Sequence, residues 1–386
     1  EIVGKNNGKY FDKKGWLYFT RETFDLLYPG YGDTYPTFNG AIGMTYEMPG
    51  HSTSGLAVKT MKGDTLTLSD RIDMHFTTSI ATLEACYLNH ESLINEFTEF
   101  FNLNSDPNTY YILKSTRPDR IDMLTELLDK NKIIYKSPSK TRALKAYSYE
   151  KDKMVSIELN EEDLIIPQNQ PKSTLVKVLF ERNTKLIDTL TYDITAWSLP
   201  FVYGLDAYQA QEHIDLSDYN PVTYSVKKSD EKPYAYLLNW TSIKDARFLS
   251  TILNKGMKVN FSTKSFPYDG MNFSAGTLII TRVDNEKTIN NYDDELLKIA
   301  NKLNRNLIPV FSGSAISSLD LGSSKISFLK KPKIAMIAGD DISTLNFGEL
   351  WYFFEQDINF PIDIISKNTM RDVDLDEYDV LLLASG

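Results

Sequence analysis

The chain has 386 residues, 42% of them hydrophobic, which is enough for about two to four domains of roughly 100–200 residues each. Its formal net charge of -10 argues against a nucleic-acid surface along the chain, because phosphate binding needs a basic face. Cys86 is its one cysteine and cannot form an internal disulfide, and no apolar run approaches the ~20 residues of a membrane span. We expect no nucleic-acid partner and no membrane span, and the composition leaves the oligomeric state open.

Two predicted strands and a loop rich in Gly, Pro and Tyr open the chain. Residues 16–19 (WLYF) have the apolar content of a short strand, and residues 41–47 (AIGMTYE) resemble a strand buried on both faces. Residues 28–39 (YPGYGDTYPTFN) predict a rigid, irregular loop, because Pro and Gly at this density exclude a helix. Glu47 ends the second strand, where α/β folds place ligands and chemistry.

A hairpin and a long helix are predicted next. Lys62-Gly63-Asp64 lies between β-prone residues and predicts a hairpin within residues 58–68. Ser69 or Asp70 is a suitable cap for a helix from about Arg71 to Phe101. Apolar residues recur along this helix at three- and four-residue steps, so one face is expected to be buried. These residues are Ile72, Phe76, Ile80, Leu83, Tyr87, Ile94, Phe97 and Phe101.

Residues 27–47 (LYPGYGDTYPTFNGAIGMTYE) resemble the C-terminal active-site stretch of zinc carboxypeptidases of the carboxypeptidase A type. The resemblance covers about residues 10–105. It implies that Tyr28 covers the substrate, that Asp33 shapes the substrate pocket and that Glu47 is the catalytic glutamate. Asp33 and Glu47 lie 47 − 33 = 14 positions apart, which agrees with the family spacing, whereas the interval from Tyr28 is a few residues short.

The implied chemistry explains why a glutamate is needed. Peptide hydrolysis requires a water molecule that is nucleophilic at neutral pH. A zinc ion lowers the pKa of this water, and an adjacent carboxylate takes its proton and passes it to the leaving amine. The resemblance assigns this general-base role to Glu47. Position alone allows the alternative of a strand-end carboxylate paired with a nearby cation.

The zinc ligands that the resemblance implies, two His and one Glu, cannot be recognised in this chain. In the family they form an HxxE pair and a later His, all upstream of the glutamate strand. The histidines of this chain all follow Glu47, and none begins an HxxE: His51, His75, His90 and His213. We expect His75 and His90 to be ordinary polar residues of the long helix.

The ends of the sequence favour a fragment of a complete enzyme over a protein that lost its metal site. The chain begins at Glu1 rather than at a methionine and stops directly after an apolar strand. Zinc is therefore expected in the intact parent and is not bound by this chain, which should hydrolyse nothing alone. The family is commonly exported, so the resemblance implies a periplasmic or secreted parent.

Residues 107–330 contain a faint duplication. Residues 121–136 (IDMLTELLDKNKIIYK) and 246–261 (ARFLSTILNKGMKVNF) both predict a helix, a polar turn and a strand. The offset of about 120 residues is longer than the period of solenoid repeats. Because strands alternate with helices, we expect two related α/β units with mostly parallel pairing. Between the units, Asp193 and Trp197 are expected to be a helix cap and a packed aromatic residue.

Each copy is expected to add similar elements around this shared core. A strand precedes it, and a further strand and a helix follow it. In the first copy these elements are 110–113, 163–170 and 173–182, and in the second they are 234–238, 276–285 and 293–304.

The last residues resemble the start of a glutamine amidotransferase-like, flavodoxin-like domain. Apolar strands at 333–338, 361–365 and 378–383 and a helix near 347–356 predict a βαβ arrangement. Gly339 follows the first strand alone, without a GxGxxG or Walker pattern, so nucleotide binding is not indicated. No cysteine follows these strands, so amidotransferase activity is not expected.

The expected fold class is α/β. An incomplete carboxypeptidase-like mixed sheet (1–106) precedes two related α/β units (107–225 and 226–330) and the start of a flavodoxin-like domain (331–386). The expected function is that of a metallocarboxypeptidase fragment whose parent hydrolyses C-terminal peptide bonds of a peptide substrate. One alternative is a non-catalytic peptide- or glycan-binding protein that uses the tyrosine-rich loop, and another is a purely structural C-terminal assembly.

Overall fold

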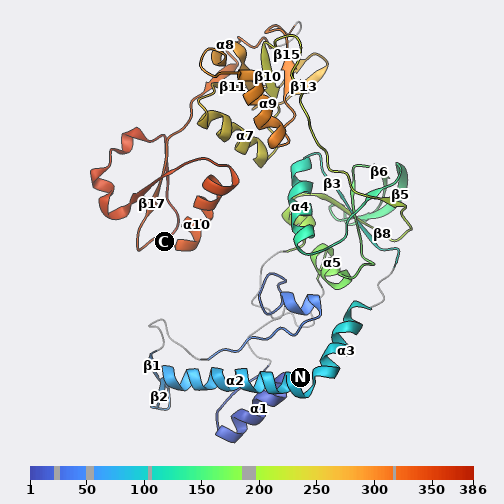
Figure 1. Cartoon of the computed structure of the whole chain (residues 1–386), viewed down its shortest axis with the longest axis vertical. Coiled ribbons are helices and arrows are strands. Elements are labelled where there is room, and N and C mark those ends of the chain that lie inside the picture. Colours follow the sequence, from blue (N-terminus) through green and yellow to red (C-terminus); the bar gives the residue numbers. More distant parts are fainter. Residues whose placement is uncertain (21–26, 49–55, 103–106, 185–196, 316–318) are drawn as a thin grey trace. The chain divides into compact units, whose positions relative to one another are not determined.

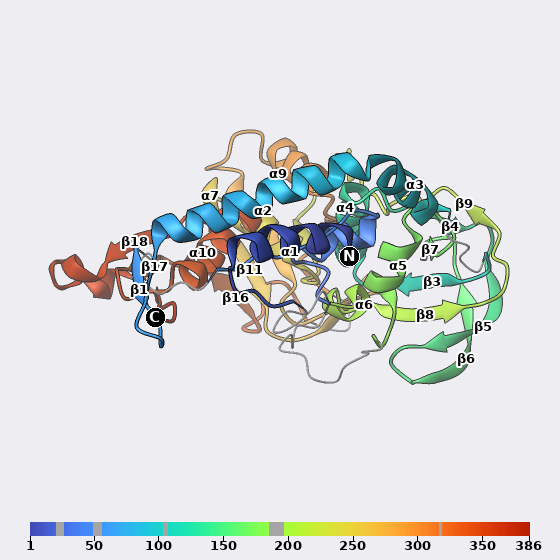
Figure 2. The same ribbon diagram turned by 90° about the horizontal axis from the view of Figure 1, so that it is seen from below.

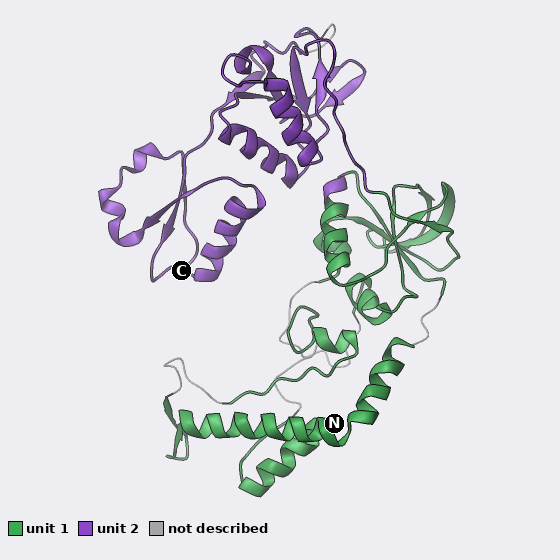
Figure 3. Cartoon of the chain, in the orientation of Figure 1, with its two compact units in different colours: residues 1–116, 120–220 green, residues 117–119, 221–386 purple. Residues whose placement is uncertain are grey.

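The structure, a computed structural model, describes residues 1–20, 27–48, 56–102, 107–184, 197–315 and 319–386. These residues divide into two units, 1–116 with 120–220 and 117–119 with 221–386 (Figure 3). Helices and strands occur in both units, so the mixed α/β class is confirmed. Within the described ranges, no helix combines the length and the apolar character needed to cross a bilayer.

Helices dominate residues 1–102 (Figure 1). The elements are α1 (Ile2–Lys14), the 3-10 helix η1 (Tyr35–Asn39), the hairpin strands β1 (Ala57–Lys59) and β2 (Thr65–Thr67), α2 (Leu68–Leu88) and α3 (His90–Phe101). The predicted hairpin is confirmed. The predicted single helix is interrupted at Asn89, and its cap is Thr67, whose side chain forms a capping box with Asp70. The loop that was expected to exclude any helix contains η1.

The two strands predicted before residue 48 do not form. Residues 16–19 and 41–47 pair with no other strand among the described residues. The expectation that 41–47 is buried on both faces is also wrong, because the Ile42 side chain is 52% exposed and Glu47 is exposed. Apolar content makes a segment suitable for a sheet, but a strand needs neighbours that satisfy its backbone N–H and C=O groups.

Helix α2 buries the face opposite to the one expected. Its small residues Thr77, Thr78, Ala81 and Ala85 are buried, and α1 runs alongside it (Figure 2). The Asn6 amide of α1 donates to the Ala81 carbonyl over 2.8 Å. The large apolar residues that were predicted to be buried lie on the opposite side of α2, within an arc of about 80° around the helix axis. These residues are Ile72, Phe76, Ile80, Leu83 and Tyr87, and all of them are exposed.

The first repeat, which we define as residues 107–220, follows these helices. Its principal elements are β3 (Tyr110–Lys114), α4 (Pro118–Lys130), β4 (Ser137–Pro138), β7 (Leu164–Pro167), α5 (Ser173–Phe180) and β8 (Asp206–Ala210). The strands β5 (Arg142–Ser148) and β6 (Lys153–Leu159) form a hairpin between β4 and β7, and α6 (Leu199–Val202) and β9 (Leu216–Ser217) are short. The sheet order is β6-β5-β8-β3-β7, and Lys136, just before β4, bridges to Ile165 of β7.

The second repeat, residues 221–330, has the same plan. Its principal elements are β10 (Ala235–Leu238), α7 (Ile243–Asn254), β11 (Val259–Ser262), β14 (Leu278–Thr281), α9 (Tyr292–Lys302) and β15 (Ile308–Val310). The hairpin of β12 (Phe266–Tyr268) and β13 (Met271–Phe273) is again inserted before the third principal strand, and α8 (Arg282–Asn285) and β16 (Ile326–Leu329) complete the repeat. The sheet order is β15-β10-β14-β11-β16.

Both repeats have the βαββαβ plan of a ferredoxin-like split βαβ fold, with the principal strands in the order fourth, first, third, second. The predicted duplication therefore matches the observed elements, but the predicted parallel pairing is wrong. Every principal strand pair is antiparallel. The helix after the first strand leads to a parallel strand that lies two positions away, and an antiparallel strand fills the gap between them.

The same backbone details recur at the end of the first helix of each repeat. Lys132 and Gly256 both adopt a positive φ, of 57° and 80°, directly after α4 and α7. In the residue that follows each of them, the backbone N–H bonds back to the helix. The Ile133 N–H donates to the Leu128 carbonyl, and the Met257 N–H donates to the Ile252 carbonyl, each over 3.0 Å. This is the left-handed ending of a Schellman motif.

A side-chain amide then clamps the start of the second strand in each repeat. Gln170 accepts from the Ile134 N–H over 2.6 Å and donates to the Ile134 carbonyl over 3.0 Å. Asn285 does the same to Lys258, over 2.7 Å and 2.9 Å. Each amide also donates to a carbonyl of its own strand end, at Pro167 for Gln170 and at Thr281 for Asn285. The two repeats therefore share hydrogen bonds as well as topology.

The chain ends in a small parallel sheet. Its elements are β17 (Ile334–Ala338), α10 (Thr344–Tyr352), the π-helical turn η2 (Phe353–Asp357), β18 (Asp363–Ser366), the 3-10 helices η3 (Lys367–Asp372) and η4 (Leu375–Glu377), and β19 (Val380–Leu382). The three strands are parallel in the order β18-β17-β19, as the βαβ prediction requires. Apolar clusters cover both faces of β17.

Candidate functional site

Tyr28 lies in a chain of tight turns and packs against two other rings. Its carbonyl accepts from the Tyr31 N–H over 3.2 Å, and the Tyr31 carbonyl accepts from the Thr34 N–H over 3.2 Å. The Tyr28 ring stands edge-on to the Tyr31 ring, with centroids 5.0 Å apart, and lies 5.9 Å from the Trp197 ring. Trp197 is packed as predicted, and its indole N–H donates to the Val178 carbonyl. Asp193 lies outside the described residues.

Asp33 is bonded to the segment that carries Glu47. The Thr45 hydroxyl donates to one Asp33 carboxylate oxygen, and the Thr34 hydroxyl donates to the other over 3.3 Å. The Thr45 hydrogen bond, with the others that Asp33 accepts, lowers the pKa of Asp33 below its ordinary value. Because the pKa is lowered, the link between Asp33 and Thr45 is present above the ordinary Asp range. It is lost as the pH falls through the lowered value.

Gly43 makes this contact sterically feasible. A Cβ added there would lie 1.6 Å from the Asp33 carbonyl oxygen, closer than any side chain could approach. Only glycine lets the backbone of residues 41–47 come so near to the Asp33 turn. The pairing of Asp33 with this segment therefore depends on the sequence at position 43.

Tyr46 fixes the same segment to the helices. Its hydroxyl accepts from the Asn7 side-chain amide of α1 over 3.0 Å and lies 3.1 Å from the Thr82 hydroxyl of α2. Asn7 is only 8% exposed, and its Oδ1 has no hydrogen-bond partner in the described structure. A buried acceptor without a partner costs free energy, so this position can gain from a further donor.

Glu47 directly follows the two residues that anchor the segment, and its own side chain is exposed. The hydrogen bond from Thr45 thus connects the Asp33 turn to a residue that lies two positions before Glu47. It also places Tyr28 in the same turn-rich loop as Asp33. No strand or cleft wall formed by described residues encloses the Glu47 carboxylate, so the enclosed position expected for a catalytic base is not formed by these residues alone.

Two of the histidines, His75 and His90, lie on helices as expected. His75 and His90 are exposed on α2 and α3, and His90 Nδ1 lies 2.8 Å from the Tyr87 carbonyl oxygen. His213 Nε2 lies 3.2 Å from Asp215 Oδ1, and His51 lies outside the described residues. The described ranges contain no group of three or more His, Cys, Asp or Glu residues that could hold a metal ion.

Sequence reasoning missed the residues that anchor the loop to the first repeat. The Tyr35 hydroxyl donates to Asn131 Oδ1 over 2.6 Å, and Lys172 Nζ donates to Asn39 Oδ1 over 2.7 Å. Phe38 packs against the apolar core of the repeat. These partners lie about 90–130 positions apart in the chain, beyond the reach of local patterns.

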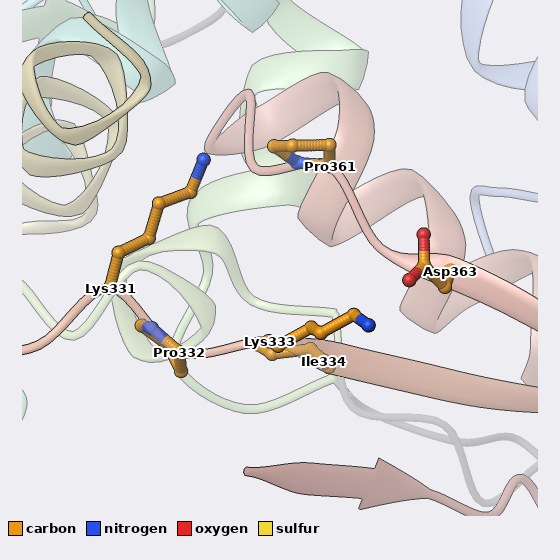
Figure 4. Close-up of a pocket in the computed structure, with 6 residues that line it drawn as sticks. All are labelled: Lys331, Pro332, Lys333, Ile334, Pro361 and Asp363. Atoms are coloured by element: carbon orange, nitrogen blue, oxygen red, sulfur yellow. The ribbon is translucent and has the colours of Figure 1, made fainter. Parts of the chain in front are cut away.

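A hollow of about 280 Å³ lies at the start of β17 and β18 (Figure 4). It is lined by Lys331, Pro332, Lys333, Ile334, Pro361 and Asp363. Two of its charged side chains are already engaged, because Lys333 Nζ lies 2.6 Å from Glu377 and the Tyr378 hydroxyl donates to Asp363 over 3.0 Å. It also lies at the N-terminal ends of the strands, whereas parallel sheets bind ligands at the C-terminal ends. None of the predicted site residues lines it.

Comparison of the chain with protein-family models, with curated proteins and with solved structures gives no match.

Proposed function

We propose that this chain is the C-terminal part of a zinc-dependent metallocarboxypeptidase, with Glu47 as the general base of the intact enzyme. The resemblance of residues 27–47 to that family supports the proposal. So does the bond between Thr45 and Asp33, which links the pocket turn to the segment of the glutamate. Residues 331–386 are proposed to begin a flavodoxin-like domain, since their strand order β18-β17-β19 matches the start of that fold.

The observation that carries the proposal is the uncovered apolar surface of α2 and α3, the helices that follow Glu47 in the chain. Phe76, Tyr87 and Phe97 are 64%, 77% and 48% exposed. Aromatic side chains carry about 150–250 Å² each, so these three alone leave roughly 300–400 Å² uncovered. The largest apolar patch on a typical monomer is only about 300–600 Å², and the exposed aliphatic residues of α2 add to the area here. Such a surface is expected on part of a catalytic domain that further residues complete.

Residues 41–47 lead to the same conclusion. They are apolar, yet they pair with no strand in the described structure, and the Ile42 side chain is 52% exposed. A sheet completed by residues outside this sequence would satisfy their backbone groups and enclose Glu47. The same residues would also provide a donor for Asn7.

The chain itself supplies the base but not the metal site. Its described residues contain no group that fits a zinc ion, and the proposed ligands are residues outside this sequence. In the proposed reaction, the Glu47 carboxylate accepts a proton from the attacking water and delivers it to the leaving amine. Asp33 and Tyr28 shape the substrate side of the same loop.

The test uses a polypeptide that adds the upstream residues encoded with this chain. It should release C-terminal residues from peptides and lose this activity in chelator. Glu47→Gln should lower turnover at least ~100-fold, the usual contribution of a general base. Glu99→Gln, at an exposed glutamate of α3, is the matched control and should leave turnover unchanged.

Three results would contradict the proposal. Unchanged turnover in Glu47→Gln would remove this residue from the mechanism. An upstream reading frame without an HxxE and a later His would remove the metal site. Peptide or glycan binding by the chain that persists in chelator and survives Glu47→Gln would favour the non-catalytic alternative. Full activity without residues 107–386 would instead assign those residues a purely structural role.

A further inference from the structure

The loop assigned to substrate binding is anchored to the first repeat through its 3-10 helix. Within residues 1–116 and 120–220, η1 contacts α5 directly. Tyr35, at the start of η1, bonds to Asn131, and Asn39, at its end, bonds to Lys172. The Phe38 side chain between them packs on the apolar core of the repeat. Both ends and the middle of η1 are therefore tied to the repeat.

Two further contacts extend this anchor on either side of η1. Before it, the Tyr28 ring packs on Trp197, whose indole N–H is bonded to the Val178 carbonyl of α5. After it, the Lys172 ammonium lies 5.9 Å from the centre of the Phe101 ring at the end of α3. The repeat thus contacts the loop at Tyr28 as well as at η1.

The anchored loop is connected to the segment of the general base. Asp33 lies two residues before Tyr35, and its carboxylate accepts from Thr45. The backbone of Gly43 packs on the Asp33 carbonyl. A displacement of η1 would therefore move Asp33 and, through Thr45, the backbone that carries Glu47.

We propose that the first repeat positions the substrate-binding loop, with Tyr35 and Asn39 as positioning residues and Asn131 and Lys172 as their partners. The loop would then present Tyr28 and Asp33 to the C-terminal end of a peptide in a fixed arrangement. This proposal rests on the proposed function for its substrate class. It assigns residues 107–220 a role in substrate affinity, which an appended domain would not have.

The test measures hydrogen exchange in the 386-residue chain. A Tyr35→Phe and Lys172→Met double variant removes both hydrogen bonds and should speed the exchange of amides in residues 27–48 about tenfold. Lys172→Arg keeps a donor toward Asn39 and should restore much of the protection when it replaces Lys172→Met. Lys177→Met changes an exposed lysine of the same helix and should alter nothing in 27–48.

Unchanged exchange in residues 27–48 of the double variant would overturn the proposal. An equal increase in the strands β3 and β7 would also overturn it, because the variant would then have loosened the whole repeat. If Lys172→Met and Lys177→Met speed exchange in residues 27–48 equally, the loss of a positive charge is responsible. The loss of the bond between Lys172 and Asn39 is then not the cause, which also contradicts the proposal.

A second measurement separates this proposal from the proposed function. In the N-terminally extended polypeptide, the double variant should raise KM for peptides about tenfold. It should also lower kcat, because the bond from Thr45 to Asp33 connects the loop to the segment of Glu47. Activity in the parent polypeptide with an unchanged KM in the variant would overturn the positioning role and leave the peptidase assignment standing. A parent without peptidase activity would overturn that assignment, while the exchange data would still decide whether the repeat holds the loop.

Discussion

Residues 1–102 and the second repeat differ in how they cover their apolar residues. The described part of 1–102 buries four hydrophobic residues, Val3, Phe11, Ala81 and Ala85. The second repeat buries an apolar cluster on each face of its sheet, one under α7 and α9 and one under the hairpin β12–β13. Helices therefore form in both regions, but only the repeat encloses a core. Local sequence signals are enough to form a helix, and a core requires that the covering layer is also present.

The contrast is clearest between α7 and α2. The apolar residues of α7 include Phe248 and Ile252, both fully buried against the sheet. The corresponding stripe on α2 includes Phe76 and Leu83, which are 64% and 66% exposed. The described residues therefore leave the apolar stripe of α2 uncovered.

The largest expected change in stability comes from a comparison of the same substitution at two phenylalanines. Phe248→Ala should destabilise the second repeat by about 3–5 kcal/mol, because it leaves a cavity in a closed core. Phe76→Ala should change stability by no more than about 0.5 kcal/mol in the chain alone, since its ring is already largely in water. Urea denaturation combined with hydrogen exchange reports the two regions separately. A loss of several kcal/mol in Phe76→Ala would mean that a second copy or another layer already covers α2.

A smaller effect is expected at the amide clamp of the second repeat. Asn285→Ala should cost about 1–3 kcal/mol, because it removes a fully buried side-chain amide that bonds to the N–H and C=O of Lys258. Asn272→Ala, at an exposed asparagine of the β12–β13 hairpin, is the control and should cost less than about 0.5 kcal/mol. Equal losses in the two variants, measured by the same urea denaturation, would show that the clamp contributes no specific stability.

The smallest effects concern the positive-φ residues after α4 and α7. Lys132→Gly should stabilise the first repeat by about 0.5–1 kcal/mol, since glycine adopts φ of 57° without a Cβ penalty. Gly256→Ala should destabilise the second repeat by about 1 kcal/mol through φ alone, because an added Cβ meets no atom within 4 Å. Thermal denaturation measures both shifts. Changes of the same sign in the two variants would contradict a shared left-handed ending.

Much of the secondary structure could be predicted because its signals are local. The helices α4 and α7 follow from apolar periodicity and overlap the stretches 121–136 and 246–261 that predict them, and α9 lies within two residues of the predicted 293–304. The direction of strand pairing could not be predicted in the same way, because it depends on which strand fills the gap between two parallel ones. The hairpin β5–β6 and the strand β8 were not predicted at all.

The candidate site was predictable only in part. The resemblance assigns Asp33 and Glu47 to one site, and the structure bonds Thr45, two residues before Glu47, to Asp33. The catalytic roles of Tyr28, Asp33 and Glu47 stay predictions. The contacts of Tyr35 and Asn39 with the first repeat could not be foreseen, because no local pattern relates residues so far apart in the chain.

The two amide clamps have a consequence for the substitutions that each repeat tolerates. Gln170 lies three residues after its strand-end partner Pro167, and Asn285 lies four residues after Thr281. The longer side chain in one copy compensates for the different backbone offset, so two different residues reach the same pair of peptide groups. An exchange of asparagine for glutamine at 285, ordinarily regarded as mild, would overshoot Lys258. The two repeats are therefore more alike in the peptide groups that are held than in the residues that hold them.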